Sequence, residues 1–146
     1  MKIFFDTNVL AAAFGTRGLC LDLLKLTIQT NELVLGEPVA AELRRVLPEK
    51  FRMPPARVER LLGLLREYYV ALPVDMGVDV ALRDPGDRLI VLSAIAGQAD
   101  VLVTGDRDLL EADLPIRVMT PRELWLTIRH GLRADMVHEL SSRRVG

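Results

Sequence analysis

Two aspartates in this chain stand directly after short apolar segments. Asp6 follows Ile3-Phe4-Phe5, and Asp106 follows Val101-Leu102-Val103-Thr104 after one glycine. Short apolar segments bounded by polar or turn residues are typical of buried strands. In an open parallel sheet, ligands bind beyond the carboxyl ends of the strands. If the two strands are neighbours, both carboxylates are placed for chemistry at one edge of the sheet.

Two further acidic residues have positions from which they can join this pair. Asp87 precedes an apolar helical pattern that leads into the second strand, and Glu42 lies in a helical segment among small and apolar neighbours. Carboxylates within a few ångströms of each other repel, so some must take up protons unless a cation compensates. Mg²⁺ and Mn²⁺ prefer oxygen ligands. An all-carboxylate site of this kind most often acts on phosphate esters, because the metal polarises the phosphoryl group and activates water.

Other chemistry fits the sequence less well. His130 and His138 both lie in the C-terminal part of the chain, which argues against a zinc site and against a Ser-His-Asp triad. Each acid also has a simpler interpretation: Asp6 could cap the helix that follows it, Asp87 is the natural N-cap of its helix, and Asp84 suits a turn. Spacing alone leaves these alternatives open.

The elements that must position these acids alternate along the chain. We predict strands at 2–6, 33–36, 69–74, 101–104 and 116–119. We predict helices at 17–30, at 38–47 with Pro48 as its end, at 57–68, at 88–98, and after a capping box at Thr120–Glu123. This alternation favours an α/β sandwich with a mainly parallel sheet. Right-handed crossovers can then make the first and fourth strands neighbours.

The bulk properties fit one globular domain that covers residues 1–146. The 146 residues suit a single domain, and the single Cys20 excludes an internal disulfide framework. In the segment 131–146 we expect a short C-terminal helix with Met136, Val137 and Leu140 on one face, followed by a flexible tail. We find neither a signal peptide nor an apolar segment long enough to span a membrane, so we expect a soluble, cytoplasmic protein.

The order of the motifs resembles the PIN-domain ribonucleases, in particular the toxin-type, VapC-like PIN proteins of prokaryotic toxin–antitoxin pairs. The motifs are Phe5-Asp6-Thr7-Asn8-Val9-Leu10, Ala41-Glu42-Leu43, Asp84-Pro85-Gly86-Asp87, and Val103-Thr104-Gly105-Asp106-Arg107-Asp108-Leu109. The resemblance covers roughly residues 1–125. It implies a three-layer α/β/α sandwich with a central, mainly parallel sheet of about five strands, and an endoribonuclease that depends on Mg²⁺ or Mn²⁺.

Carried over position by position, the resemblance implies that Asp6, Glu42, Asp87 and Asp106 are the catalytic and metal-binding residues. Three further residues would support them: Asn8 by orienting Asp6, Thr104 by orienting Asp106, and Asp84 as a weaker candidate. Relatives often read Asp-Pro-Asp-Asp where this chain reads Asp84-Pro85-Gly86-Asp87. One acid is therefore missing at Gly86, which leaves the number and affinity of the metals open.

The partners follow from the same resemblance and from local charge. The net charge of −1 does not indicate nucleic-acid binding, yet residues 44–66 are locally basic. Arg44, Arg45 and Arg52 are therefore candidates for contacts with RNA phosphates. The resemblance implies an antitoxin partner, with 129–146 as a candidate contact. It also implies a homodimer, for which the apolar helices at 17–30 and 55–69 could supply the interface.

Two other function classes make different demands on the sequence. A response-regulator receiver would need a lysine late in the chain, but the lysines are Lys2, Lys25 and Lys50. A non-catalytic PIN-like scaffold that binds RNA or protein stays an alternative because of Gly86.

Overall fold

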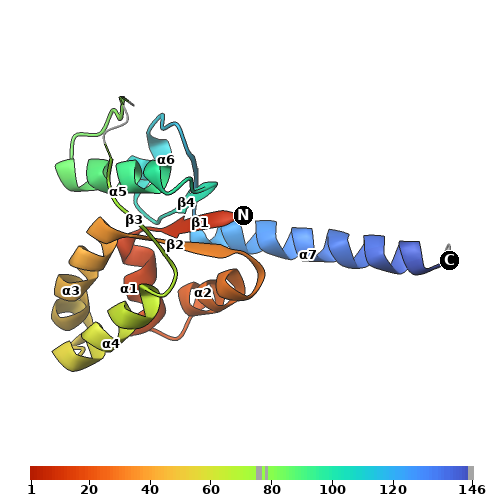
Figure 1. Ribbon diagram of the computed structural model, residues 1–146, viewed down its shortest axis with the longest axis horizontal. Helices are drawn as coiled ribbons and strands as arrows, with labels where there is room; N and C mark the ends of the chain where they lie inside the picture. The colour runs from red at the N-terminus through yellow and green to blue at the C-terminus, as the bar shows by residue number, and fades with distance from the viewer. Residues whose placement is uncertain (75–76, 78, 145–146) are drawn as a thin grey trace.

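The computed structural model describes residues 1–74, 77 and 79–144 (Figure 1). Five strands alternate with seven helices within these ranges. In chain order the elements are β1 (Lys2–Phe5), α1 (Thr7–Gly15), α2 (Leu19–Thr30), β2 (Glu32–Gly36), α3 (Glu37–Phe51), α4 (Pro55–Leu65), β3 (Tyr69–Ala71), α5 (Pro85–Ala96), β4 (Val101–Val103), α6 (Arg107–Glu111), β5 (Arg117–Met119) and α7 (Pro121–Arg144).

The five strands form one parallel sheet in the order β3-β2-β1-β4-β5. β1 is the central strand, and its residue Phe5 pairs with Val103 of β4. The predicted sheet and the predicted adjacency of the first and fourth strands are both confirmed. The strand order reverses between β1 and β4, which makes the carboxyl ends of these two strands the topological switch point.

The helices cover both faces of the sheet. In Figure 1, α1 to α4 lie on one side, and α5 and α6 lie on the other. Right-handed crossovers explain this arrangement, because the chain steps outward from β1 to β3 in one direction and from β1 through β4 to β5 in the opposite one. The three-layer α/β/α sandwich is confirmed. The helices α1 and α6, which follow β1 and β4 directly, were not among the predicted elements.

The core is centred on β1. Ile3 and Phe4 are completely buried and Phe5 almost so, as expected for a central strand covered on both faces. Full burial of a large apolar side chain contributes roughly 1.5–3 kcal/mol. Gly36 ends β2 where the ring of Phe4 leaves no room: a Cβ there would lie 2.4 Å from Phe4 Cζ. Glycine at this position lets α3 begin directly at the edge where the site lies.

The prediction that Pro48 ends the third helix is wrong. The helix α3 continues through Pro48 to Phe51 and ends at Arg52, which adopts a left-handed conformation with φ of 52°. A proline inside a helix removes one backbone hydrogen bond and costs about 3 kcal/mol. Burial of Val46 and Leu47 beside it, and of Met53 just beyond, offsets that cost. Four residues beyond the predicted end, 48–51, thereby become part of the helix, among them Lys50 and Phe51.

The start of α5 also differs from the prediction. Asp84, and not Asp87, is the N-cap: its Oδ1 accepts hydrogen bonds from the backbone N–H of Gly86 at 2.7 Å and of Asp87 at 3.2 Å. Pro85 occupies the first helical position, where the missing N–H has no cost. The helix therefore starts three residues earlier than predicted, and the carboxylate of Asp87 is not used as a cap.

The C-terminal helix α7 is one element of 24 residues. We expected a separate helix after Gly131, but Gly131 does not interrupt it, and residues 141–144 continue the same helix. The predicted fraying of residues 145–146 lies outside the described residues. Leu124 and Ile128 anchor the first half, and Figure 1 shows the second half projecting from the body. Among the helices described, none has the length and apolar character needed to cross a bilayer.

Candidate active site

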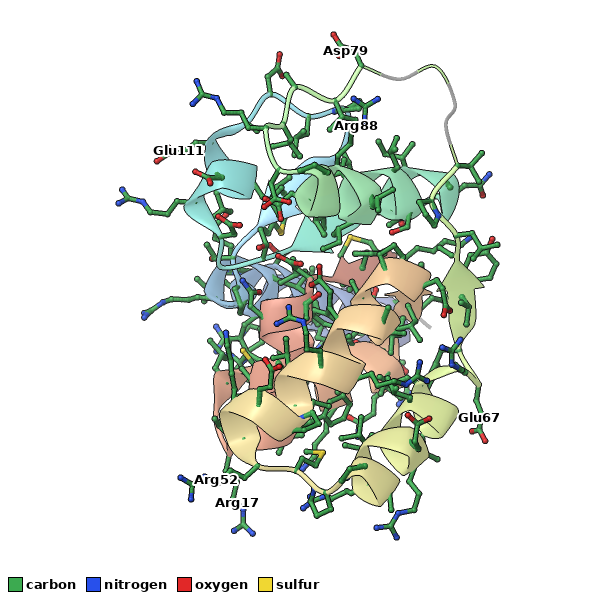
Figure 2. All side chains as sticks on the ribbon, turned by 90° about the vertical axis from the view of Figure 1, so that its left-hand side faces the viewer. Arg17, Arg52, Glu67, Asp79, Arg88 and Glu111 are labelled. Carbon is green, nitrogen blue, oxygen red and sulfur yellow. The ribbon has the colours of Figure 1, made fainter. Side chains whose placement is uncertain are left out.

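A cleft of about 280 Å³ lies at the carboxyl end of β1, and all four predicted acids line it. Asp6 follows β1, Glu42 lies on α3, Asp87 lies in the first turn of α5, and Asp106 caps α6. Figure 2 looks toward this side of the molecule, with α3 in front and several side-chain oxygens gathered between α3 and α5. Four elements far apart in sequence thus bring their carboxylates to one place.

Asp6 is the buried carboxylate of the set, with 6% of its surface exposed. Its Oδ1 accepts a 2.7 Å hydrogen bond from the backbone N–H of Thr7, as an N-cap of α1, and its Oδ2 accepts one of 2.7 Å from Thr104 Oγ1. Burial raises the pKa of Asp6, and the charges of Glu42 and Asp106 raise it further, while the two hydrogen bonds lower it. Asp6 is therefore both a helix cap and a member of the acidic cluster.

Thr104 acts on two acids and not on one. Sequence predicted that it orients Asp106; in the structure its hydroxyl donates to the side chain of Asp6 and accepts a 3.0 Å hydrogen bond from the backbone N–H of Asp106. The side chain of Asp106 accepts a 2.9 Å hydrogen bond from the backbone N–H of Asp108, and through this contact Asp106 caps α6. Thr104 is fully buried, so its hydrogen bond to Asp6 is shielded from water, whereas the contact between Asp106 and Asp108 is exposed.

Thr7 is a site residue that the sequence analysis left without a role. Its Oγ1 donates a 2.5 Å hydrogen bond to Glu42 Oε2, which links the first turn of α1 to α3. Thr7 is buried and lines the cleft, whereas Glu42 is half-buried. The sequence held one sign of this role: Thr7 carries a hydroxyl group and directly follows Asp6 at the end of β1.

Asp87 carries the largest electrostatic perturbation in the cleft. Its pKa is raised to about 6, first by burial and then by the charges of Asp84, Asp106, Asp6 and Glu42, in that order. None of the described residues donates a hydrogen bond to its carboxylate. A partly desolvated carboxylate surrounded by like charges is a strong candidate for cation binding.

Comparison with known families decides which family this fold and site belong to. A family model described as "PIN domain" matches residues 2–108. This chain belongs to the PIN-domain family. The match confirms the family predicted from the motifs, and it covers all four acids. No curated protein sequence matches the chain significantly.

Solved structures with the same fold agree with this assignment. One is the crystal structure of VapBC2 from Rickettsia felis bound to a promoter DNA fragment. A chain of that structure matches this chain with a TM-score of 0.58 and 19% sequence identity, and the match covers 82% of this chain and 98% of that chain. VapBC-1 from nontypeable Haemophilus influenzae gives a TM-score of 0.56 and 16% identity, with 84% and 99% covered. At these identities the likeness concerns the fold of the PIN domain.

The side chains in the cleft of this PIN domain offer the oxygen ligands that a hard divalent cation prefers. All four acidic side chains are carboxylates, and burial together with their mutual repulsion raises the pKa of Asp6 and Asp87, a cost that a cation would relieve. Across residues 1–74, 77 and 79–144, however, no three His, Cys, Asp or Glu side chains are already arranged to hold a metal ion. The oxygens needed are present, and the side chains must move together to share an ion.

The remaining predicted site residues divide into two groups. Asn8 is exposed and lines the cleft, near Gly105 at the end of β4, whereas the hydrogen bonds to Asp6 come from Thr7 and Thr104. Arg45 also lines the cleft. Arg44 instead binds Glu59 of α4 through two hydrogen bonds of 2.7 and 3.3 Å, and Arg52 lies beyond the end of α3, outside the cleft lining.

Proposed function

We propose that this PIN domain is an endoribonuclease that hydrolyses RNA phosphodiester bonds with Mg²⁺ or Mn²⁺. One observation carries the proposal: four carboxylates from four separate elements line one cleft at the topological switch point. A fold needs no such convergence for its stability, because mutual repulsion of the carboxylates is unfavourable in the absence of a cation.

The four acids would hold the metal, and their side chains differ in how firmly the surrounding residues hold them. Asp6 is fixed by Thr104 and Thr7, and would serve as the rigid ligand. Asp87 and Glu42 are only partly buried, so they can turn toward a bound ion. When bound, such an ion polarises the scissile phosphate and lowers the pKa of a water molecule. The alternative is a non-catalytic PIN-like scaffold that binds RNA or protein, which the missing acid at Gly86 keeps open.

Cleavage of a mixed structured RNA by the purified protein tests the proposal. We expect cutting with Mn²⁺ or Mg²⁺, none with chelator, and none from Asp6→Asn or Asp87→Asn proteins whose circular dichroism is unchanged. Full activity in both variants would contradict the assigned site. Metal binding by calorimetry without any RNA turnover would instead support the scaffold.

We further propose that the protein is the toxin of a toxin–antitoxin pair, because its fold is similar to that of chains in VapBC complexes. Four exposed apolar residues of α7 that follow Arg129 are candidates for the antitoxin contact: Leu132, Met136, Val137 and Leu140. Of the described residues, truncation after Arg129 removes only exposed ones, so the truncated body should fold. Unchanged capture of the neighbouring gene's product by the truncated protein would reject this contact.

A homodimer is the remaining proposed partner. The helices α2 and α4 expose Leu19, Ile28 and Leu64, which could lie in such an interface. Size-exclusion chromatography with light scattering should give twice the mass of the chain. A clean monomer at high concentration would reject the dimer.

A further inference from the structure

The acids form only one part of the cleft, and the face of α3 that carries Glu42 continues beyond them. Arg45, Val46 and Lys50 line the same cleft as Glu42. These positions are three, four and eight residues from Glu42, so they lie on one face of the helix. At a rise of 1.5 Å per residue, Lys50 lies about 12 Å along the helix axis from Glu42. This face exists because α3 continues through Pro48.

Apolar side chains line the cleft together with the charged ones. They belong to Ala11, Val46, Phe51 and Ile90. The ring of Phe51 lies against Gly15 at the end of α1, where an added Cβ would be 2.3 Å from the ring. Glycine at this position therefore allows the aromatic ring to form a fixed wall of the cleft. The ring remains partly exposed.

The two cations in the cleft are free to bind an anion. Among the described residues, Lys50 makes no ion pair, and Arg45 makes one at 3.4 Å to Glu49, its neighbour on the same exposed face. Exposed pairs of this kind contribute little, so a phosphate can replace Glu49 as the partner of Arg45. Arg44, by contrast, is held by the bidentate contact with Glu59.

We propose that this face of α3 is a binding site for single-stranded RNA next to the acids. Arg45 and Lys50 bind the backbone phosphates that flank the scissile one, and Phe51 with Val46 packs against a base. Single-strand sites elsewhere combine a cationic track for the backbone with aromatic side chains for the bases. The choice of RNA as the ligand rests on the proposed function. The site adds a direction for the bound RNA strand, which runs from Glu42 toward the C-terminus of α3.

Binding measured apart from cleavage tests the site. The Asp6→Asn protein in Mg²⁺ would be titrated into a fluorescein-labelled, random-sequence RNA of ten nucleotides, and anisotropy would be followed at several salt concentrations. Adding Lys50→Gln should weaken binding about fivefold and lower the salt dependence by about 0.7, the value for one phosphate contact on a single strand. Phe51→Leu, which keeps an apolar group against Gly15, should weaken binding by about fivefold or more. Lys25→Gln, an exposed lysine of α2, is the matched control and should have no effect.

The outcomes separate this inference from the proposed function. If the native protein cuts RNA but both variants bind like the Lys25→Gln control, the site on α3 is wrong and the nuclease stands. If Lys50→Gln and Phe51→Leu weaken binding but no condition gives cleavage, the site stands and the nuclease is wrong. Binding of a labelled ten-residue polyglutamate, or of single-stranded DNA alone, with no binding of the RNA would overturn RNA as the ligand.

Discussion

The hydroxyl of Thr104 donates a 2.7 Å hydrogen bond to Oδ2 of Asp6, and this contact joins the ends of two neighbouring strands. The same hydroxyl accepts the backbone N–H of Asp106, so one buried threonine positions two of the four acids. Asp6 is fixed from the other side by the backbone of Thr7. Of the four carboxylates, Asp6 therefore accepts the most hydrogen bonds from the described residues, at the point where β1 meets β4.

Replacement of Thr104 by valine should damage both stability and metal binding. Valine has a similar shape but leaves the N–H of Asp106 and one oxygen of Asp6 without their partner, at a cost of about 1–3 kcal/mol. The Thr104 hydrogen bond lowers the pKa of Asp6, so its loss should raise that pKa and weaken metal binding near neutral pH. Urea denaturation and calorimetric Mn²⁺ titration measure the two effects. Thr104→Ser keeps the hydroxyl and should stay near the wild type; equal losses in both variants would refute the role of the hydrogen bond.

The raised pKa of Asp87 predicts how stability depends on pH in the metal-free protein. Its pKa is about 6 in the folded chain against an ordinary 3.8, so folding disfavours the charged form. The penalty is absent below pH 3.8, grows as the pH rises to about 6, and is complete above that. Asp87→Asn should therefore raise the free energy of unfolding at pH 7 by about 1 kcal/mol, a value reduced for solvent screening of this partly exposed group.

Urea denaturation with chelator at pH 4, 5, 6 and 7 measures this difference. Asp113→Asn, which removes an exposed carboxylate outside the cleft lining, is the matched control. A difference between Asp87→Asn and the wild type that is the same at all four pH values would contradict the prediction. In the wild type, metal affinity should fall as the pH drops through about 6, because the ligand must be deprotonated.

Restoring the missing acid at Gly86 should strengthen metal binding. A Cβ at this position would lie 3.8 Å from Glu42 Oε1 and 3.0 Å from Asp84 Oδ1, so an aspartate there faces the acids. We expect Gly86→Asp to raise Mn²⁺ affinity on the order of tenfold over Gly86→Ala, since charge count tunes the affinity of carboxylate sites. Gly86→Ala controls for the gain in helix propensity and for the close approach to Asp84. Equal affinities in the two variants, measured by calorimetry, would show that position 86 does not reach the metal.

Asp84 should matter for stability more than for chemistry. It caps α5 through two backbone N–H groups, so Asp84→Ala should lower the free energy of unfolding by about 1 kcal/mol. Asp84→Asn keeps the capping oxygen and should cost little. Because the charge of Asp84 raises the pKa of Asp87, both variants should lower that pKa, which an NMR titration of Asp87 would detect. Loss of cleavage in a stable Asp84→Asn protein would instead make Asp84 part of the reaction.

Local sequence patterns predicted most of the fold. Apolar segments such as Ile3-Phe4-Phe5 mark central strands, because a strand covered on both faces must be apolar throughout. The positions of Asp6 and Asp106 after two such strands were also enough to predict that their carboxylates share one edge of the sheet. The errors concern helices: α1 and α6 were not predicted, Pro48 stays inside α3, and Asp84 takes the cap that was expected from Asp87. Helix ends depend on packing and on competing caps, which local propensity does not contain.

The amino-acid sequence by itself therefore predicted the family, the parallel α/β architecture and the four acids that line one cleft, since each prediction depends on residue type and on order along the chain. Only the tertiary structure decided how those acids are held. The hydroxyl groups of Thr7 and Thr104 find their partners across 35 and 98 residues, and no local pattern specifies contacts at such separations. The same holds for Lys50 and Phe51, which reach the cleft because the buried side chains around Pro48 keep α3 helical to its end.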